Sequence, residues 1–420
     1  MSSLLLTDVA LVDGREPTHI YVEDGLVQEL GRKVDTDRTI DGRGCVALPG
    51  LVNAHTHAAM VLLRGYGDDM VLQDWLAKRI WPAEANLTGE DIYWGTRLAC
   101  LEMVRTGTTA FADMYFFGPR MADAAHDAGL RAVISEGFID LGDEERREAN
   151  ISATEATTRH IRQMGDPRVV PSVGPHAIYT VSPAGWEWIK AYSKEEDLLV
   201  HTHLAETERE VIDCHSENGT SPLGLLERLG ILERPMLAAH CVHLSDEDVT
   251  LMGKRGVAAV HNPVSNMKLA VAGVMPWSDL ARAGAHPVLG TDGAASNNSL
   301  DMFETMKSAA LLQKLGGDPT MLPAREVLEA ATLGGARALG LPGGRIAQGE
   351  AADIILVSME RIGMIPAHDL ASNLVYAGAG HAVTTTICDG NVLMEGGVIP
   401  DETEILGRGL QVAMDLVSRG

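Results

Sequence analysis

Two histidines separated by one residue end the apolar stretch LPGLVNAHTH, residues 48–57. The side chains of a β-strand alternate between its two faces, so His55 and His57 point to the same side. Two imidazoles on one face of a buried strand can both bind a single transition-metal ion. The motif alone is a weak signal, because a lone core histidine more often satisfies a backbone hydrogen bond.

Several other strand-like stretches end in the same kinds of side chain. Each buried polar group needs a partner, and convergent imidazoles and carboxylates can share a metal ion. Their recurrence therefore favours one metal site over a set of unrelated core histidines. The further candidates are His176, His201, His203, Glu206, His240 and Asp292.

The ligand types predict the metal and its chemistry. Imidazoles with one carboxylate suit Zn²⁺ or Fe²⁺ better than Mg²⁺ or Ca²⁺, which prefer oxygen ligands. Such an ion turns water into a hydroxide nucleophile near neutral pH if a base takes the proton. Asp292 and His240 are the candidate bases.

Glu206 follows His203 by three residues, where a strand gives way to its loop. A carboxyl group there can reach the substrate side of the metal and act as a general acid and base. The alternative is a helix cap or an exposed loop acid in the run ETERE. Glu208 and Glu210, in the same run, are interpreted as solvated helix charges.

The elements that must position these residues are eight strand-like runs alternating with helical stretches. This order predicts an α/β fold with a parallel (β/α)₈ TIM barrel, here over residues 50–343, and the strand ends of such a barrel converge on one mouth. Short β patterns before and after it predict a small flanking β-sandwich domain built from residues 1–49 plus 344–420. The eight runs are CVALPGLVNAHTH, TTAFADMY, RAVISEGFID, VVPSVGPHAIY, LLVHTHLAE, MLAAHCVH, VAAVHNPVSN and HPVLGTDGA.

Composition excludes several classes of protein. The formal charge of -24 disfavours electrostatic binding to nucleic acid or to an anionic membrane. Five cysteines, far apart and without a CxxC pair, argue against a disulfide framework and a thiolate zinc site. Neither a signal peptide nor a membrane span is evident, so we expect a cytoplasmic location. A homo-oligomer is expected on general grounds.

Taken together, these motifs resemble the amidohydrolase superfamily, and within it the 5'-methylthioadenosine/S-adenosylhomocysteine deaminases. The resemblance covers essentially the whole chain. It implies that His55, His57, His203 and Asp292 hold one divalent metal ion. The motifs that carry it are PGLVNAHTH, TGTTAFADMY, VGPHAIYTVS, HTHLAE, AAHCVH, HNPVSNMKL, GTDGAASNN and GRIAQGEAADIIL.

The resemblance also implies catalytic roles. Glu206 would shuttle protons to the purine, and His240 would orient the attacking water or the tetrahedral intermediate. Superfamily members with two metals bridge them through a carbamylated lysine at the end of strand four. This chain has VGPHAIY there, without lysine, which favours a single metal. His201 is interpreted as support for the metal ligands.

Substrate contacts follow from the same resemblance. Glu84, in WPAEANLT, matches the acid that accepts hydrogen bonds from both ribose hydroxyls, and a carboxylate suits a vicinal diol. A surface acid in a helical loop is the alternative. His176 would lie near the ribose and base. Arg146 would meet the 5' extension, although the adjacent Arg147 leaves the register open.

These expectations converge on hydrolytic deamination at C6 of an adenine nucleoside with a modified 5' position. The expected substrates are S-adenosylhomocysteine, 5'-methylthioadenosine, 5'-deoxyadenosine and adenosine, and the products are ammonia and the inosine analogue. The alternative enzyme is another mononuclear amidohydrolase that acts on guanine, cytosine or a triazine ring. A barrel without catalytic activity is the alternative of a different class.

Overall fold

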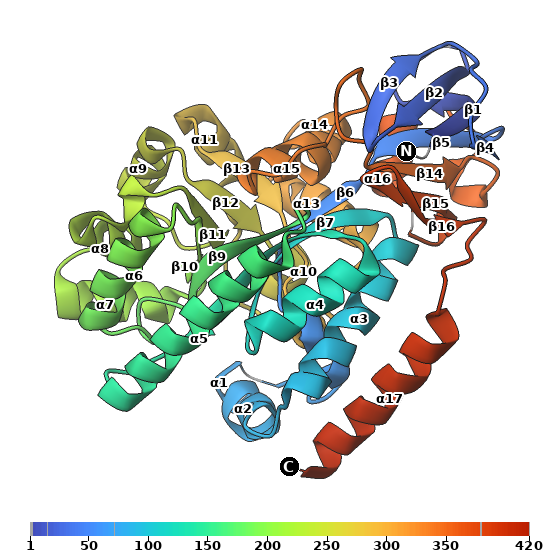
Figure 1. Ribbon diagram of the computed structural model, residues 1–420. Helices are drawn as coiled ribbons and strands as arrows, with labels where there is room; N and C mark the ends of the chain where they lie inside the picture. The colour runs from blue at the N-terminus through green and yellow to red at the C-terminus, as the bar shows by residue number, and fades with distance from the viewer. Residues whose placement is uncertain (1–2, 15, 71, 379, 420) are drawn as a thin grey trace.

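The computed structural model describes residues 3–14, 16–70, 72–378 and 380–419. It contains two sheets, and Figure 1 shows them side by side. One is an eight-stranded sheet from the middle of the chain, surrounded by helices. The other combines the blue and red ends of the chain. The candidate residues belong to the first sheet and its loops.

The central sheet confirms the eight predicted barrel strands. Neighbouring strands pair in parallel in sequence order, from β6 to β13. Most of their residues are buried, because helices cover the outside and side chains fill the inside. The strands are β6 (Leu51–Thr56), β7 (Thr108–Tyr115), β8 (Arg131–Phe138), β9 (Val169–Pro175), β10 (Val200–Leu204), β11 (Met236–His240), β12 (Ala258–His261) and β13 (His286–Leu289).

Hydrogen bonds beyond the strand ladders join the last strand to the first. The Asn53 side chain accepts a bond from the backbone N–H of Thr291 at 2.9 Å and donates to the Thr291 hydroxyl at 2.7 Å. The backbone N–H of Asp292 donates to the carbonyl of His55 at 3.0 Å. These contacts bring Asp292 beside His55, although some 240 positions separate them in the chain.

Helices alternate with the barrel strands, as predicted. The helix that begins after Ser245 shows how such a stretch starts, because the Ser245 side chain caps it together with Asp248. The helices of the barrel region are α3 (Gly89–Arg105), α4 (Gly118–Ala128), α5 (Glu144–Met164), α6 (Pro183–Glu195), α7 (Glu208–Asn218), α8 (Pro222–Leu229), η3 (Ile231–Glu233), α9 (Asp246–Arg255), α10 (Pro263–Lys268), α11 (Trp277–Ala283), α12 (Ala294–Asn297), α13 (Met302–Lys314), α14 (Ala324–Glu329), η4 (Ala330–Gly334) and α15 (Gly335–Ala338).

A helical insertion follows the first barrel strand. It consists of η1 (Ala58–Leu63), α1 (Leu72–Trp75), η2 (Leu76–Ile80) and α2 (Trp81–Glu84). Its short elements precede the regular barrel helix α3 and carry Glu84 at their end. The insertion therefore supplies a wall to the mouth of the barrel.

The second sheet confirms a flanking β domain made from both ends of the chain. Its strands follow the order β16-β15-β14-β5-β1-β2-β3, with β4 paired to β1. The two ends meet where β5 pairs antiparallel with β14. The strands are β1 (Ser3–Leu11), β2 (Thr18–Glu23), β3 (Leu26–Leu30), β4 (Arg38–Asp41), β5 (Cys45–Pro49), β14 (Ile354–Ser358), β15 (Val383–Cys388) and β16 (Asn391–Glu395).

The last helix, α17 (Glu402–Arg419), lies along α3 of the barrel rather than on the second sheet (Figure 1). Arg419 of α17 bonds to Asp91 of α3 at 2.7 Å. The short elements η5 (Ile362–Met364), α16 (Leu370–Tyr376) and η6 (Gly380–Ala382) precede β15. The domain boundaries, 1–49 plus 344–420 for the small β domain and 50–343 for the barrel, remain a prediction. The helix α17 falls in the range predicted for the small domain, but it packs on the barrel.

None of the helices in the described ranges is both long enough and apolar enough to cross a membrane.

Candidate metal centre and active site

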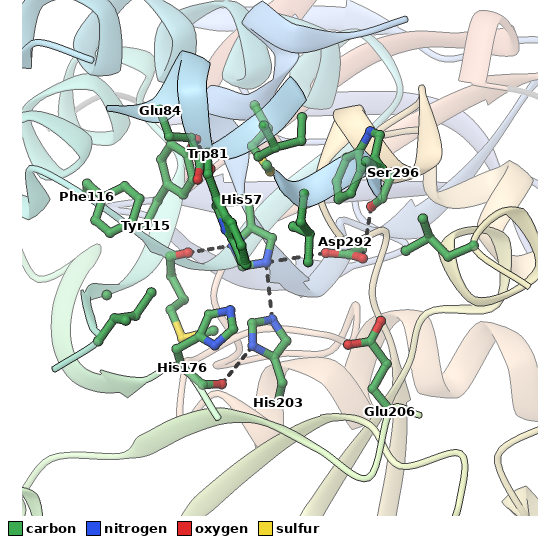
Figure 2. Close-up of a pocket in the computed structure, with 18 of the residues that line it drawn as sticks. His57, Trp81, Glu84, Tyr115, Phe116, His176, His203, Glu206, Asp292 and Ser296 are labelled. Carbon is green, nitrogen blue, oxygen red and sulfur yellow. Dashed lines mark hydrogen bonds and ion pairs between the residues drawn. The ribbon is translucent and has the colours of Figure 1, made fainter. Parts of the chain in front are cut away.

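A cavity opens at the carboxyl ends of the barrel strands, where the predicted site residues converge. Its volume is about 850 Å³, including the part open to solvent. In Figure 2, Glu84 and Glu206 lie on opposite sides of the cluster formed by His57, His203 and Asp292. The predicted residues that line the cavity are His57, Glu84, His176, His203, Glu206, His240 and Asp292.

His57 and His203 face each other through their Nε2 atoms, 3.2 Å apart. The Nδ1 atom of His57 lies 2.6 Å from the carbonyl of Met114, and that of His203 lies 2.8 Å from the carbonyl of His176. A carbonyl only accepts, so each Nδ1 carries the ring's proton. In the neutral rings, both Nε2 lone pairs therefore point at each other. Two lone pairs that face each other repel, and a cation bound by both nitrogens would remove this repulsion.

His55 and Asp292 complete the cluster. The Oδ1 atom of Asp292 lies 3.5 Å from Nε2 of His55 and 3.4 Å from Nε2 of His57. The Nδ1 atom of His55 is 2.7 Å from Nε2 of His201. The His55 Nε2 atom is buried without a hydrogen bond and is directed to the cluster. His201 thus orients His55, as expected for a residue that supports a ligand.

The charges of the cluster suit a divalent cation. Burial lowers the pKa of His55 to about 4 and that of His203 well below its usual value. Burial works to raise the pKa of Asp292, but the nearby imidazoles of His55, His57 and His240 hold it well below its usual value. Neutral imidazoles and an ionised carboxylate are metal ligands in their binding form. The donor set fits a divalent metal ion.

Two hydroxyl groups hold the other oxygen of Asp292. Ser265 donates to Oδ2 at 2.5 Å and Ser296 donates to it at 3.0 Å. These bonds leave Oδ1 directed at His55 and His57. Neither serine was among the predicted site residues, although both stand in the motifs HNPVSNMKL and GTDGAASNN.

Glu206 and His240 lie next to the cluster. The Oε1 atom of Glu206 is 3.9 Å from Nδ1 of His240, and the Oδ1 atom of Asn266 is 2.8 Å from the same nitrogen. Burial raises the pKa of Glu206. Burial alone would lower the pKa of His240, but the carboxylates of Glu206 and Asp292 raise it. Both groups therefore keep a proton to higher pH than the free side chains would.

Glu84 and His176 form the other side of the cavity. The hydroxyl of Tyr115 donates to Oε1 of Glu84 at 2.7 Å, and burial raises the pKa of Glu84. His176 lies 3.0 Å from the Thr180 hydroxyl through Nδ1, and burial lowers its pKa to about 3. Glu84 is thus a lining carboxylate rather than a surface acid.

The structure does not bring Arg146 to the cavity. Its side chain is exposed in the first turn of α5, where its backbone N–H bonds to Asp143. Arg147 lies 3.6 Å from Glu144 of the same turn. Neither arginine is among the lining residues, because this turn projects toward solvent. The predicted contact of Arg146 with a 5' extension has no support in the geometry.

The interpretation of Glu210 as a solvated charge is wrong, whereas Glu208 is exposed as expected. Only 6% of the Glu210 surface is exposed. Sequence reasoning also missed the apolar wall that Trp75, Leu76 and Trp81 contribute from the helical insertion. The sequence feature that could have indicated this wall is the pair of tryptophans, Trp75 and Trp81, shortly before Glu84.

Comparison with known proteins identifies the family. Residues 46–393 match the model of the amidohydrolase family. A 5'-deoxyadenosine deaminase of Methanoregula boonei is 51% identical, over 99% of this chain and 96% of that protein. A 5-methylthioadenosine/S-adenosylhomocysteine deaminase of Archaeoglobus fulgidus is 45% identical, over 96% of this chain and 94% of its own length.

The fold agrees with this family. A crystal structure of an adenosine deaminase from Xanthomonas campestris, with bound zinc, superposes with a TM-score of 0.93 at 34% identity. The match covers 99% of this chain and 98% of that one. A triazine hydrolase structure, at 24% identity and a TM-score of 0.88, shares the fold. The chain therefore belongs to the amidohydrolase family, as its strand-end histidines and its two-sheet architecture indicate.

Proposed function

We propose that this protein is a metal-dependent hydrolytic deaminase that converts 5'-modified adenosines to the inosine analogues and ammonia. The observation that carries the proposal is that one cavity joins the metal-donor cluster and Glu206 to Glu84 on the opposite side. A purine held with C6 at the cluster would direct its ribose toward Glu84. The relatives named as deaminases of adenine nucleosides support the same substrate class.

The proposed ligands are His55, His57, His203 and Asp292, holding one divalent ion. Zn²⁺ is proposed, with Fe²⁺ as the alternative that the same donors accept. The zinc bound in the adenosine deaminase from Xanthomonas campestris supports this choice. When bound, such an ion supplies the Lewis acidity that makes water nucleophilic near neutral pH.

The protein's own groups then move the protons. Water adds to C6, and Asp292 and His240 orient it and accept its proton. Glu206, whose pKa is raised by burial, donates a proton to the ring nitrogen next to C6. As the C6–N bond breaks, the proton taken from the water passes to the leaving amino group and the proton of the C6 hydroxyl returns to Glu206, so ammonia leaves, the C6 carbonyl of hypoxanthine forms and Glu206 is restored. His240 Nδ1 lies 3.9 Å from Oε1 of Glu206, within range of its charge but beyond direct hydrogen-bond contact.

The remaining contacts are proposed for the ribose and its 5' group. Glu84 would accept hydrogen bonds from both ribose hydroxyls, and His176 would lie near the ribose and base. The 5' group would meet the wall of Trp75, Leu76 and Trp81. Among the described residues that line the cavity there is no lysine or arginine. This favours uncharged 5' groups, as in 5'-deoxyadenosine and 5'-methylthioadenosine, over the carboxylate of S-adenosylhomocysteine.

The proposal is tested by the ultraviolet spectrum of each substrate incubated with the metal-loaded protein. We expect 5'-deoxyadenosine, 5'-methylthioadenosine and adenosine to shift to the inosine spectrum, and S-adenosylhomocysteine to react with a lower kcat/KM. Conversion of guanine or cytosine instead would identify a different ring hydrolase. Stoichiometric metal without conversion of any purine or pyrimidine would identify a barrel without this activity.

Glu84→Gln is expected to raise KM for ribonucleosides by about 10- to 100-fold, because a charge-assisted hydrogen bond contributes roughly 1.5–3 kcal/mol. The effect should fall mainly on KM, since Glu84 lies away from the reacting carbon. Steady-state kinetics with 5'-deoxyadenosine measure it. For 2',3'-dideoxyadenosine, which lacks the diol, kcat/KM should change little. Glu90→Gln, an exposed neighbour in α3, is the matched control. Equal losses for both substrates would refute the diol contact.

A further inference from the structure

The turn between β10 and α7 carries Glu206 into the cavity. β10 ends at Leu204, and Thr207 caps α7 by accepting a bond from the backbone N–H of Glu210 at 3.2 Å. Only Ala205 and Glu206 lie between the strand and the cap. The direction of the Glu206 side chain therefore depends on the backbone of these two residues.

Ala205 has a left-handed backbone, with φ of +49°. A residue with a Cβ atom adopts this conformation at a cost of about 1–3 kcal/mol, and only where its surroundings impose it. The carbonyl of Ala205 accepts bonds from the backbone N–H groups of Val242 and His243, at 3.1 and 2.9 Å. The turn is thus fastened to the loop that follows His240.

The N–H groups of the turn are fastened by the buried carboxylate of Glu210. Its Oε1 atom accepts from the backbone N–H of Ala205 at 3.0 Å, and its Oε2 atom from that of Glu206 at 2.9 Å. Both oxygens are used, one for each of two successive residues. Burial raises the pKa of Glu210 to about 7, while the two backbone bonds favour its ionised form, in which each bond is roughly twice as strong as a neutral one. An exposed helix charge would make neither bond.

We propose that Glu210 is a positioning residue for the deamination, which holds the strained Ala205–Glu206 turn so that Glu206 faces the substrate. The inference rests on the proposed function, because it assumes that Glu206 transfers protons in the deamination. Glu210 does not line the cavity. Its loss should therefore lower kcat and leave KM and metal content unchanged.

Two substitutions test the role. Glu210→Gln keeps the shape but replaces one acceptor oxygen by an N–H group that faces a backbone N–H. Glu210→Asp keeps the charge but is one methylene shorter and does not span both bonds. Each should lower kcat by about 10- to 100-fold, since a misplacement near 1 Å can lower the rate 10²-fold. Glu208→Gln, two positions away and exposed, should keep the wild-type kcat.

A double-mutant cycle separates positioning from a general structural effect. If Glu210 acts through Glu206, Glu210→Gln should lower kcat by less than about 2-fold in the Glu206→Gln background, where the positioned carboxyl group is already lost. The same fold-loss in both backgrounds, or a wild-type kcat in both Glu210 variants, would overturn the inference. If Glu210→Gln does not fold, Glu210→Asp carries the same test. Full activity of Glu206→Gln alone would instead overturn the proposed mechanism.

Discussion

Glu206→Gln is expected to lower kcat for 5'-deoxyadenosine by about 10²- to 10⁴-fold, the usual contribution of general acid–base catalysis. The amide has nearly the same shape, but it neither donates an acidic proton to the ring nor takes one back as the C6 carbonyl forms. Glu206 is a cavity-lining carboxyl group whose pKa is raised by burial, so a larger share of it is protonated near neutral pH. Ultraviolet kinetics at saturating substrate measure the loss.

The control for this variant is Glu208→Gln. Glu208 stands two residues away on the exposed side of α7 and carries the same charge. It should leave kcat, KM and metal content unchanged. Glu206→Gln should also keep its metal, because the residue is not among the proposed ligands. A kcat within about 2-fold of wild type, measured on the metal-loaded variant, would remove Glu206 from the proton transfer that general catalysis requires.

The sequence predicted the barrel and the cluster for one physical reason. A parallel barrel places the carboxyl ends of its strands around one mouth, so strand order alone decides which side chains meet. His55 and His203 are the next-to-last residues of β6 and β10, and Asp292 lies in the loop just beyond β13, so all three stand near strand ends although they are distant in the chain. Knowing the strands was therefore sufficient to bring these residues together without any knowledge of the loops.

The loops could not be predicted in the same way. The insertion that carries Trp81 and Glu84 has short, irregular helices, so its apolar wall has no periodic signal. Arg146 was placed by resemblance, but the direction of its side chain depends on how the turn before α5 folds. Glu210 reads as one more acid in ETERE, and its burial depends on the left-handed turn at Ala205.

Strained backbone conformations occur at the ends of barrel strands that carry site residues. Ala205, His240, Cys241 and Asp292 all have positive φ, between 49° and 74°, and all lie at or just beyond the ends of barrel strands. Non-glycine residues hold such conformations where surrounding bonds over-determine them, which is common at functional sites. Here the strain turns the chain sharply enough for Glu206 and Asp292 to face the cavity. Propensity and periodicity carry no information about such turns.

His203→Ala is expected to abolish stable metal binding and to lower kcat at least as far as Glu206→Gln does. The ring of His203 is fixed by the carbonyl of His176, which leaves its Nε2 atom 3.2 Å from that of His57. Removing the His203 ring takes away one of the two opposed Nε2 lone pairs that are proposed to bind the cation. Even the loss of a group that only supports a ligand lowers metal affinity about 10- to 100-fold, so the loss of a ligand should exceed this.

Metal analysis after gel filtration, together with activity on 5'-deoxyadenosine, measures this result. Chelator treatment should inactivate the wild-type protein, and either Zn²⁺ or Fe²⁺ added back to the apoprotein should show which ion restores kcat. The same addition should not restore His203→Ala. His215→Ala, an exposed histidine on α7, is the matched control and should keep both metal and activity. If His203→Ala retained stoichiometric metal, the opposed imidazoles would need another explanation, and the proposed ligand set would fail with them. The outcome thus bears on the metal centre alone, because Glu84 and the apolar wall are untouched by the change.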